Sequence, residues 1–244
     1  TLDGAPLGAE DTAAPYIFPW DTATVADGSY ALSAVARDTA GNIGVASSVP
    51  VTVSNAGVSR FTFLAAGDYN STANTSLNLT GMASAGANFT LALGDFSYDM
   101  QTETQWCNYI KSFFGAAYPF ELLAGNHDET NIDTFASCLP DLLGNITGAY
   151  GKEYYFDYPA ASPLARFILI SPNLTINSAT YSYASTSPRY TWTSNAIDGA
   201  RSAGIPWVVV GMHKVCLSMG VKSCEIGVDL ENLLVGKKVD LVLQ

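Results

Sequence analysis

The chain contains only two histidines, and each of them follows an apolar run that is typical of a β-strand. His127 ends the run PFELLAGNH, and His213 ends the run IPWVVVGMH. Two aspartates occupy the same kind of position, because Asp68 follows RFTFLAAG and Asp95 follows ANFTLALG. Carboxylates and imidazoles at the carboxyl ends of strands can bind metal ions or transfer protons. A single Gly-Asp after a strand usually marks a turn, but four such positions in order predict a catalytic site.

Alternating strands and helices must bring these side chains to one edge of a sheet. Apolar runs predict strands at 61–66, 89–93, 120–124, 165–170, 207–210 and 239–243, and helical patterns cover about 102–114, 190–203 and 224–238. Near-continuous apolar strands separated by helices indicate an α/β fold with its sheet buried on both faces. The segment GKEYYFDYP (151–159) alternates polar and apolar residues, which predicts an antiparallel hairpin strand.

The N-terminal quarter of the chain has a different pattern. DGSYALSAVARD and IGVASSVPVTVSN alternate apolar and polar residues around the turn DTAGN, which predicts an all-β segment. Residues 1–55 resemble part of a bacterial immunoglobulin-like β-sandwich. We expect residues 56–60 to form a linker and residues 61–244 to form a catalytic domain. A half-sandwich by itself would leave unpaired strand edges. We therefore expect either that further residues precede it or that it leans on the next domain.

Composition limits the classes of function. A hydrophobic fraction of 48% with 14% charged residues describes a globular chain, and no run approaches the roughly 18 apolar residues of a membrane span. The net charge of −11 argues against a nucleic-acid-binding surface, which requires Lys and Arg at the phosphates. The same charge leaves a phosphorylated small-molecule substrate open, because bound metal ions would reverse the local field.

The four cysteines favour an exported protein. Cys216 and Cys224 are close enough for a local disulfide loop, and Cys107 and Cys138 flank the GNHD strand and can pair with each other. An even count, few lysines and many Thr, Ser, Asn and Gly residues are typical of a secreted protein. Buried free thiols are the alternative. No signal peptide is visible before TLDGAPLG.

The four strand-end motifs are GDYN (67–70), GDFSY (94–98), GNHD (125–128) and VGMH (210–213). In this order they resemble four of the five motifs of the metallophosphoesterases, and most closely those of the purple acid phosphatase branch. The resemblance covers 61 to the last residue. It implies an αββα sandwich and a dinuclear centre with two divalent or trivalent metal ions. One ion would be iron, and the other would be iron, zinc or manganese.

The resemblance also implies roles for individual residues. Asp95 would bridge the two metal ions, Asp68 and Tyr98 would bind the first, and Asn126 and His213 would bind the second. His127 and Asp128 form the catalytic pair that the resemblance implies. His127 would contact the phosphate and protonate the leaving oxygen, and Asp128 would orient its imidazole.

Several of these residues have alternative roles. Tyr98 is one of 13 tyrosines and could be a packing residue, Asn126 could cap a turn, and His213 could be a core histidine. Asn70 departs from the family pattern, which has Gly or His there. It could be a weak ligand, a turn residue or a glycan site, and this leaves the metal identity open.

The fifth motif of the family, GHxH, is absent from the chain. It would supply one histidine to each metal, but the strand KKVDLVLQ ends the sequence and no third histidine occurs. We therefore expect a catalytic domain that is truncated before its last motif, an internal segment of a longer polypeptide. The longer protein is expected to be the enzyme, since this segment alone would lack two imidazoles.

The leading hypothesis is a secreted metal-dependent phosphoester hydrolase in which a metal-bound hydroxide attacks phosphorus. Phosphomonoesters are the favoured substrates, with phosphodiesters or nucleotides also open. The alternative is an extracellular structural or adhesive protein that uses a catalytically incomplete phosphatase-like fold. In that case the β module would mediate self-association or contact with a cell surface through its open strand edges.

Overall fold

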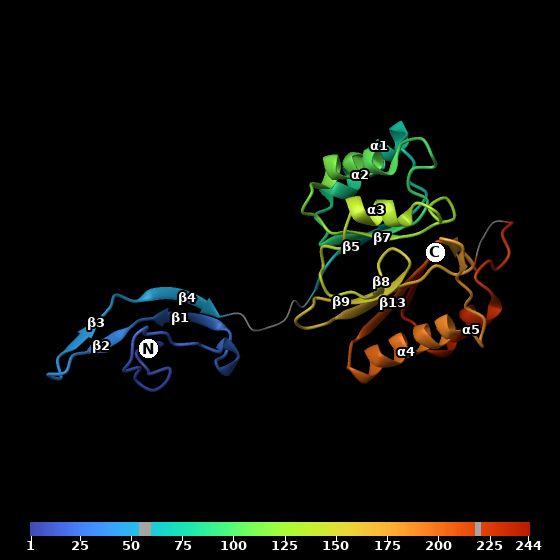
Figure 1. Cartoon of the computed structure of the whole chain (residues 1–244). Helices are drawn as coiled ribbons and strands as arrows, with labels where there is room; N and C mark the ends of the chain where they lie inside the picture. The colour runs from blue at the N-terminus through green and yellow to red at the C-terminus, as the bar shows by residue number, and fades with distance from the viewer. Residues whose placement is uncertain (54–59, 218–220) are drawn as a thin grey trace. The chain divides into compact units, whose positions relative to one another are not determined.

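The computed structural model describes residues 1–53, 60–217 and 221–244 of the chain. It divides into two compact units, Thr1–Ser59 and Arg60–Gln244 (Figure 1). Except for Arg60, the expected linker at 56–60 lies outside the described residues.

The first unit is built of short antiparallel ladders, as the alternating pattern predicts. Strand β1 (Gly28–Leu32) pairs with β4 (Val49–Val53), and β2 (Val35–Arg37) pairs with β3 (Ile43–Val45). A 3-10 helix, η1, covers Thr22–Thr24. Within the described part of this unit, only Leu2 and Val53 are buried hydrophobic residues. The all-β prediction is confirmed, and the immunoglobulin-like sandwich stays a prediction.

The second unit contains a three-stranded and a five-stranded sheet. The first sheet is parallel and has the order β5 (Phe63–Ala66), β6 (Phe89–Leu93), β7 (Phe120–Leu123). The second has the order β14-β13-β10-β9-β8, with bounds Leu241–Leu243, Trp207–Gly211, Ala165–Leu169, Glu153–Tyr158 and Thr147–Ala149. Strand β9 runs antiparallel to both of its neighbours, as its sequence pattern predicts. A two-stranded hairpin, β11 (Thr175–Ile176) with β12 (Ala179–Thr180), lies outside these sheets.

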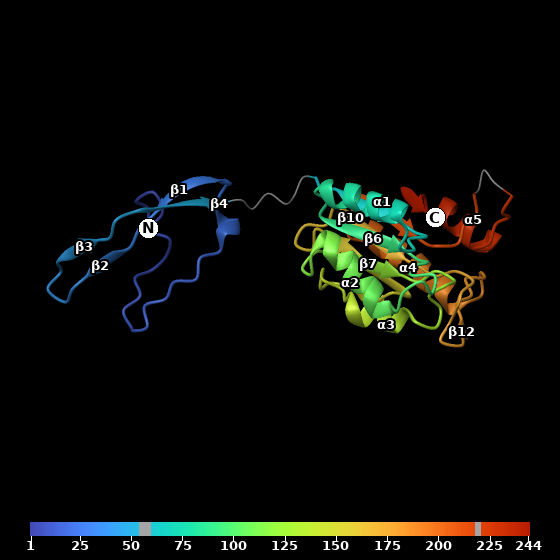
Figure 2. The same cartoon turned by 90° about the horizontal axis from the view of Figure 1, so that it is seen from above.

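Helices cover the outer faces of both sheets. Helices α1 (Ala73–Ser84), α2 (Glu103–Phe114) and α3 (Ile132–Cys138) lie together on one side, and α4 (Pro188–Ser202) and α5 (Val228–Gly236) lie on the other (Figures 1 and 2). Each central strand therefore buries both of its faces. On β10, Phe167 and Leu169 join the cluster between the sheets, while Ile168 joins the cluster that contains α4 and α5 residues. This is the expected αββα sandwich.

The sequence pattern did not predict helices α1 and α3, because neither has a clear helical signal. The sequence of α1, ANTSLNLTGMAS, is rich in Asn, Ser and Thr and contains Gly81, all of which are weak helix formers. Its N-terminus is stabilised by a capping box between Thr72 and Thr75, where the usual partner is Glu or Gln. Helix α3 has only seven residues, which is too short to show a clear period.

Both expected disulfides are present. Cys107 on α2 bonds to Cys138 at the end of α3, and Cys216 bonds to Cys224. The first bond ties α3, which begins four residues after the GNHD motif, to the longer helix α2. No free cysteine is found in the part of the chain that the structure describes.

Replacing Cys107 and Cys138 together by alanine is expected to lower the free energy of unfolding. The bond closes a loop of 31 residues, and chain entropy then predicts a loss of about 3.5 kcal/mol. In the matched variant, Cys216 and Cys224 are replaced by alanine. Their bond spans only eight residues, so we expect the free energy of unfolding to fall by about 2.5 kcal/mol. Urea unfolding measures both. Equal losses would contradict the dependence on loop length.

One buried carboxyl group lies outside the strand-end motifs. Glu121 on β7 is fully buried, and its Oε2 atom has no hydrogen-bond partner. Its Oε1 atom accepts only a long bond of 3.4 Å from the N–H of Leu142. Burial, together with the nearby charge of Asp141, raises the pKa of Glu121 to about 8. The side chain is therefore a neutral acid in the folded protein at neutral pH.

The stability of the protein should consequently fall as the pH rises from about 4.5 to about 8. In this interval the unfolded chain releases the proton of Glu121 while the folded chain keeps it, so ionisation favours unfolding. The Glu121→Gln variant removes this dependence. Relative to the wild type, it should gain roughly 2–4 kcal/mol of stability between pH 5 and pH 8 in urea titrations. Parallel pH profiles of the two proteins would contradict the assignment.

Candidate metal centre

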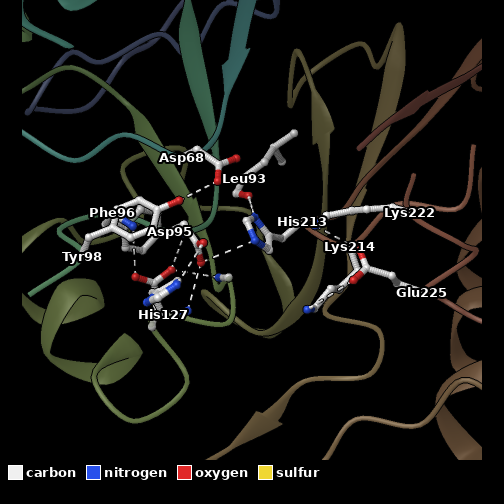
Figure 3. A network of polar contacts seen from close by, with 12 residues as sticks. Asp68, Leu93, Asp95, Phe96, Tyr98, His127, His213, Lys214, Lys222 and Glu225 are labelled. Atoms are coloured by element: carbon white, nitrogen blue, oxygen red, sulfur yellow. Dashed lines mark hydrogen bonds and ion pairs between the residues drawn. The ribbon is translucent and has the colours of Figure 1, made fainter. Parts of the chain in front are cut away.

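The carboxyl ends of strands from both sheets converge on one cluster of side chains. Asp68 follows β5, Asp95 follows β6, and His213 follows β13. One ligand atom from each of these residues lies within 4.8 Å of the others (Figure 3). The sequence placed these three residues 27 or more positions apart, and the parallel topology of the strands brings them together.

The backbone beyond β5 and β6 holds the two aspartates side by side. The N–H groups of Asp68 and Tyr69 donate to the carbonyl oxygens of Gly94 and Asp95, so the parallel ladder continues past the strands. Asp68 and Asp95 both have positive φ angles, 53° and 56°. Such angles are uncommon for side-chain-bearing residues and are typical of functional loops. The strained turns direct both carboxylates to the same place.

Asp95 lies at the centre of the cluster. Its Oδ1 atom is 3.4 Å from His213 Nε2, and its Oδ2 atom is 4.0 Å from His127 Nε2. Burial by itself raises the pKa of Asp95, but the hydrogen bond from His213 and the backbone N–H of His127 outweigh it. The pKa of Asp95 is therefore lowered to about 2. Asp95 is therefore ionised at any physiological pH.

The ring of His213 is oriented by the main chain. Its Nδ1 atom lies 2.8 Å from the carbonyl oxygen of Leu93, which can only accept a hydrogen bond. Nδ1 therefore carries a proton, and Nε2 is the ring atom that faces Asp95. Burial opposes protonation of the ring, but Asp95 outweighs this and raises the pKa of His213 above its usual value. The placement of His213 beside Asp68 and Asp95 favours the metal-ligand alternative over that of a core histidine.

Tyr98 and Asn70 differ in whether their side chains contact the cluster. The Tyr98 hydroxyl donates to Asp68 Oδ1 at 2.6 Å, so the phenol contacts a candidate ligand directly. Burial and the bond to Asp68 raise the pKa of Tyr98 well above its usual value. Asn70 instead accepts the N–H of Ser71 through its own side-chain oxygen and has a φ of 58°. This geometry matches the turn alternative for Asn70.

His127 and Asn126 lie on the exposed side of the cluster. The side chain of His127 is 47% exposed, and its ring centre is 4.6 Å from that of Tyr98. Figure 3 shows the ring beside Asp95 and Tyr98. Asn126, the residue before it, is also exposed. An imidazole in this position can reach both a bound molecule and bulk water, as proton transfer requires.

Asp128 has partners other than the expected imidazole. It is 1% exposed, and its two oxygens accept the backbone N–H groups of Asp95, Phe96 and Gly125 at 2.7–3.1 Å. Burial raises the pKa of Asp128 to about 6, against the effect of these donors. The carboxylate therefore binds the main chain of two loops and does not hold the His127 ring.

Gly94 and Gly125 allow these two loops to touch. A Cβ atom on Gly94 would lie 2.5 Å from Gly125 Cα and 2.9 Å from His213 Nδ1. A Cβ atom on Gly125 would lie 2.5 Å from the backbone nitrogen of Asp95 and would overlap its carboxylate. Any side chain here would push the bridging candidate out of place.

Sequence reasoning missed two contributors to the site. The carbonyl of Leu93 orients His213, and no side-chain pattern can reveal a main-chain acceptor. The β11–β12 hairpin supports the segment after GNHD: the N–H groups of Asn177 and Thr175 donate to the carbonyl and the carboxylate of Glu129. Short polar strands of two residues gave no periodic signal for this hairpin.

The residues present fit a metal ion. Two carboxylates, one oriented imidazole nitrogen and a phenol oxygen make a donor set that suits iron, manganese or zinc. The side-chain oxygen of Asn70 accepts the N–H of Ser71 and is therefore not counted as a ligand. The geometry directly supports four candidate ligands, which are Asp68, Asp95, Tyr98 and His213. Figure 3 also shows Lys214 and Lys222 beyond His213, where both form ion pairs with Glu225.

Replacing Gly125 by alanine should destabilise the site through contact alone. The new methyl group would meet the Asp95 backbone and carboxylate, and we expect a loss of about 1–3 kcal/mol in thermal or urea unfolding. Gly81→Ala is the matched control, because a Cβ atom there meets nothing within 4 Å and Ala is the better helix former. That control should be neutral or stabilising. A Gly125 variant as stable as the wild type would contradict the close approach.

The second unit of the chain is similar to known proteins. Residues 61–244 match the family model of the calcineurin-like phosphoesterases. The purple acid phosphatase PPD1 from yellow lupin (Lupinus luteus) seeds has a similar fold, with a TM-score of 0.55 and 15% sequence identity over 88% of this chain. The chain spans 43% of the length of that protein. No curated protein matches the chain. By its matched domain and its fold, the chain belongs to the calcineurin-like phosphoesterase family.

Proposed function

We propose that the chain carries the metal-binding core of a phosphomonoesterase with a dinuclear centre. The observation that carries the proposal is the placement of Asp95, whose carboxylate faces Asp68, His127 and His213 within the segment that matches the family. Metal ions bound here would supply a nucleophilic water and neutralise phosphate charge. Metal-dependent phosphoester hydrolysis is the chemistry of the family, and the substrate class and the number of ions are our proposal.

We assign some residues of the cluster to metal binding and one residue to proton transfer. Asp95 is ionised and central, so it is the candidate bridge, with Asp68 and Tyr98 on one side and His213 on the other. Asn126 is the further candidate ligand at the exposed edge. His127 is the candidate proton donor, because its ring lies at 4.0 Å from the bridge and remains open to an incoming phosphoester.

A phosphomonoester is our favoured substrate class. The half-exposed ring of His127 leaves one side of the cluster open to a small phosphorylated molecule. Phosphodiesters and nucleotides are the other substrate classes for the same centre. None of the described helices combines the length and hydropathy that crossing a bilayer requires. The two disulfides are compatible with our proposal that the protein is secreted.

A structural or adhesive role is the second candidate, and one observation supports it. The first unit exposes several apolar side chains, among them Ile17, Ile43 and Val45, each about two-thirds exposed. Such residues can mediate self-association or contact with a surface. The convergence of Asp68, Asp95 and His213 has no use in that role, so the hydrolase is the stronger proposal.

The test is metal binding by matched variants of this chain, with hydrolysis measured on the same variants of the longer polypeptide in which we expect the chain to lie. Asp95→Asn should abolish binding of Mn²⁺ or Zn²⁺ in calorimetric titrations, because it removes the ionised oxygen that the other ligands face. His127→Ala should keep the metal affinity but lower kcat with p-nitrophenyl phosphate about 10²- to 10⁴-fold. Bis(p-nitrophenyl) phosphate serves as the diester for comparison.

Asp198→Asn is the control, since it removes one carboxylate from an exposed position on α4. Its metal affinity and kcat should equal those of the wild type. Unchanged metal binding by the Asp95 variant would contradict the bridging role. A higher kcat/KM for the diester than for the monoester would replace the proposed substrate class by phosphodiesters.

A further inference from the structure

We propose that Asp128 is a positioning residue that sets the place of the bridging candidate Asp95 by fastening the loop after β6 to the loop after β7. Its importance for catalysis rests on the function proposed above. The hydrogen bonds that define it do not, because they are formed by the chain alone. Asp128 was expected to orient His127, and the structure assigns it this different task.

The carboxylate of Asp128 collects three donors from two separate loops. Oδ2 accepts the N–H of Asp95 at 2.7 Å and that of Gly125 at 2.8 Å, and Oδ1 accepts the N–H of Phe96 at 3.1 Å. Asp95 and Phe96 follow β6, whereas Gly125 follows β7. One buried side chain thereby holds residues that are about 30 positions apart in sequence. The three N–H donors offset part of the cost of burying this carboxylate.

Asp95 and Asp128 each accept a hydrogen bond from the backbone of the other residue's loop. The backbone N–H of Asp95 donates to Asp128, and the backbone N–H of His127 donates to Asp95 Oδ1 at 2.9 Å. The first of these bonds fixes the main chain of Asp95, and the second fixes its carboxylate. Together they orient the bridging candidate and the adjacent His127 segment as one unit. The contact between Gly94 and Gly125 leaves no room for a side chain between the two loops.

Asparagine cannot reproduce this arrangement, although it has nearly the same shape. Both oxygens of Asp128 accept N–H groups, while an amide has one oxygen and one NH₂ group. If its oxygen takes the place of Oδ2, its NH₂ group meets the N–H of Phe96. If it takes the place of Oδ1, the NH₂ group meets the N–H groups of Asp95 and Gly125. In either case a donor faces a donor, and the loops must separate.

The first experiment needs no variant. In the metal-free wild type, amide hydrogen exchange should be slowed at Asp95, Phe96 and Gly125, whose N–H groups lie beyond the ends of the strands and donate to Asp128. Exchange at these three amides as fast as in an unstructured peptide would overturn the proposal. This measurement decides the matter even if the Asp128 variant does not fold.

The second experiment compares Asp128→Asn with the control Asp198→Asn, which removes the same charge at an exposed site. In the metal-free Asp128 variant, exchange at Asp95 and Phe96 should be at least about 10-fold faster than in the control. Its dissociation constant for Mn²⁺ should rise about 10- to 100-fold, as is common when the support of a ligand is lost. Asp128→Glu keeps the charge but lengthens the side chain, and it should restore exchange protection only in part.

Each outcome separates this inference from the proposed function. A folded Asp128 variant that binds Mn²⁺ as tightly as the control would overturn the positioning role, even if it were less stable to urea. If the wild type binds no metal, the proposed function fails, while the exchange measurement still decides whether Asp128 fastens the loops. A purely structural role would lower stability without changing the metal affinity of the folded protein.

Discussion

The contact between the loops after β6 and β7 is the constraint on which the candidate centre depends. Gly94 and Gly125 meet without room for a side chain, and the buried carboxylate of Asp128 bonds to the main chain of both loops. This contact places Asp95 between His127 and His213. If the loops separated by the width of a methyl group, the three side chains would no longer face a common point. The chemistry of the centre thus rests on backbone packing.

The two sheets of the sandwich make different contributions to the centre. The parallel three-stranded sheet supplies both aspartates and His127, whose strands are adjacent in the order β5-β6-β7. The five-stranded sheet supplies His213 from the end of β13. A hydrogen bond from its ring to the carbonyl of Leu93 joins the two sheets at the centre itself. The apolar layer between the sheets, with Phe89, Phe167 and their neighbours, therefore positions ligands as well as stabilising the fold.

The electrostatics of the centre favour a cation. Asp95 stays ionised because His213 and the main chain stabilise its charge, and Asp68 lies beside it with the Tyr98 phenol as its hydrogen-bond donor. The neighbouring lysines, Lys214 and Lys222, are paired with Glu225. Asp68 and Asp95 bring two carboxylates to one place, and carboxylate oxygens are good ligands for a metal ion.

Much of this protein is determined by local sequence. Apolar runs followed by Gly-Asp, Gly-Asn or Gly-Met-His identified all four strand-end motifs, and the strand bounds agree to within two residues because buried strands admit few polar residues. The cysteine spacing identified both disulfides. Polar helices such as α1 were missed, because their stability comes from packing and from a Thr-Thr cap rather than from propensity. Only the tertiary structure decided the roles of Asn70, Asp128 and the Leu93 carbonyl. Those roles are hydrogen bonds to the main chain, and a main-chain partner leaves no mark on the amino-acid sequence.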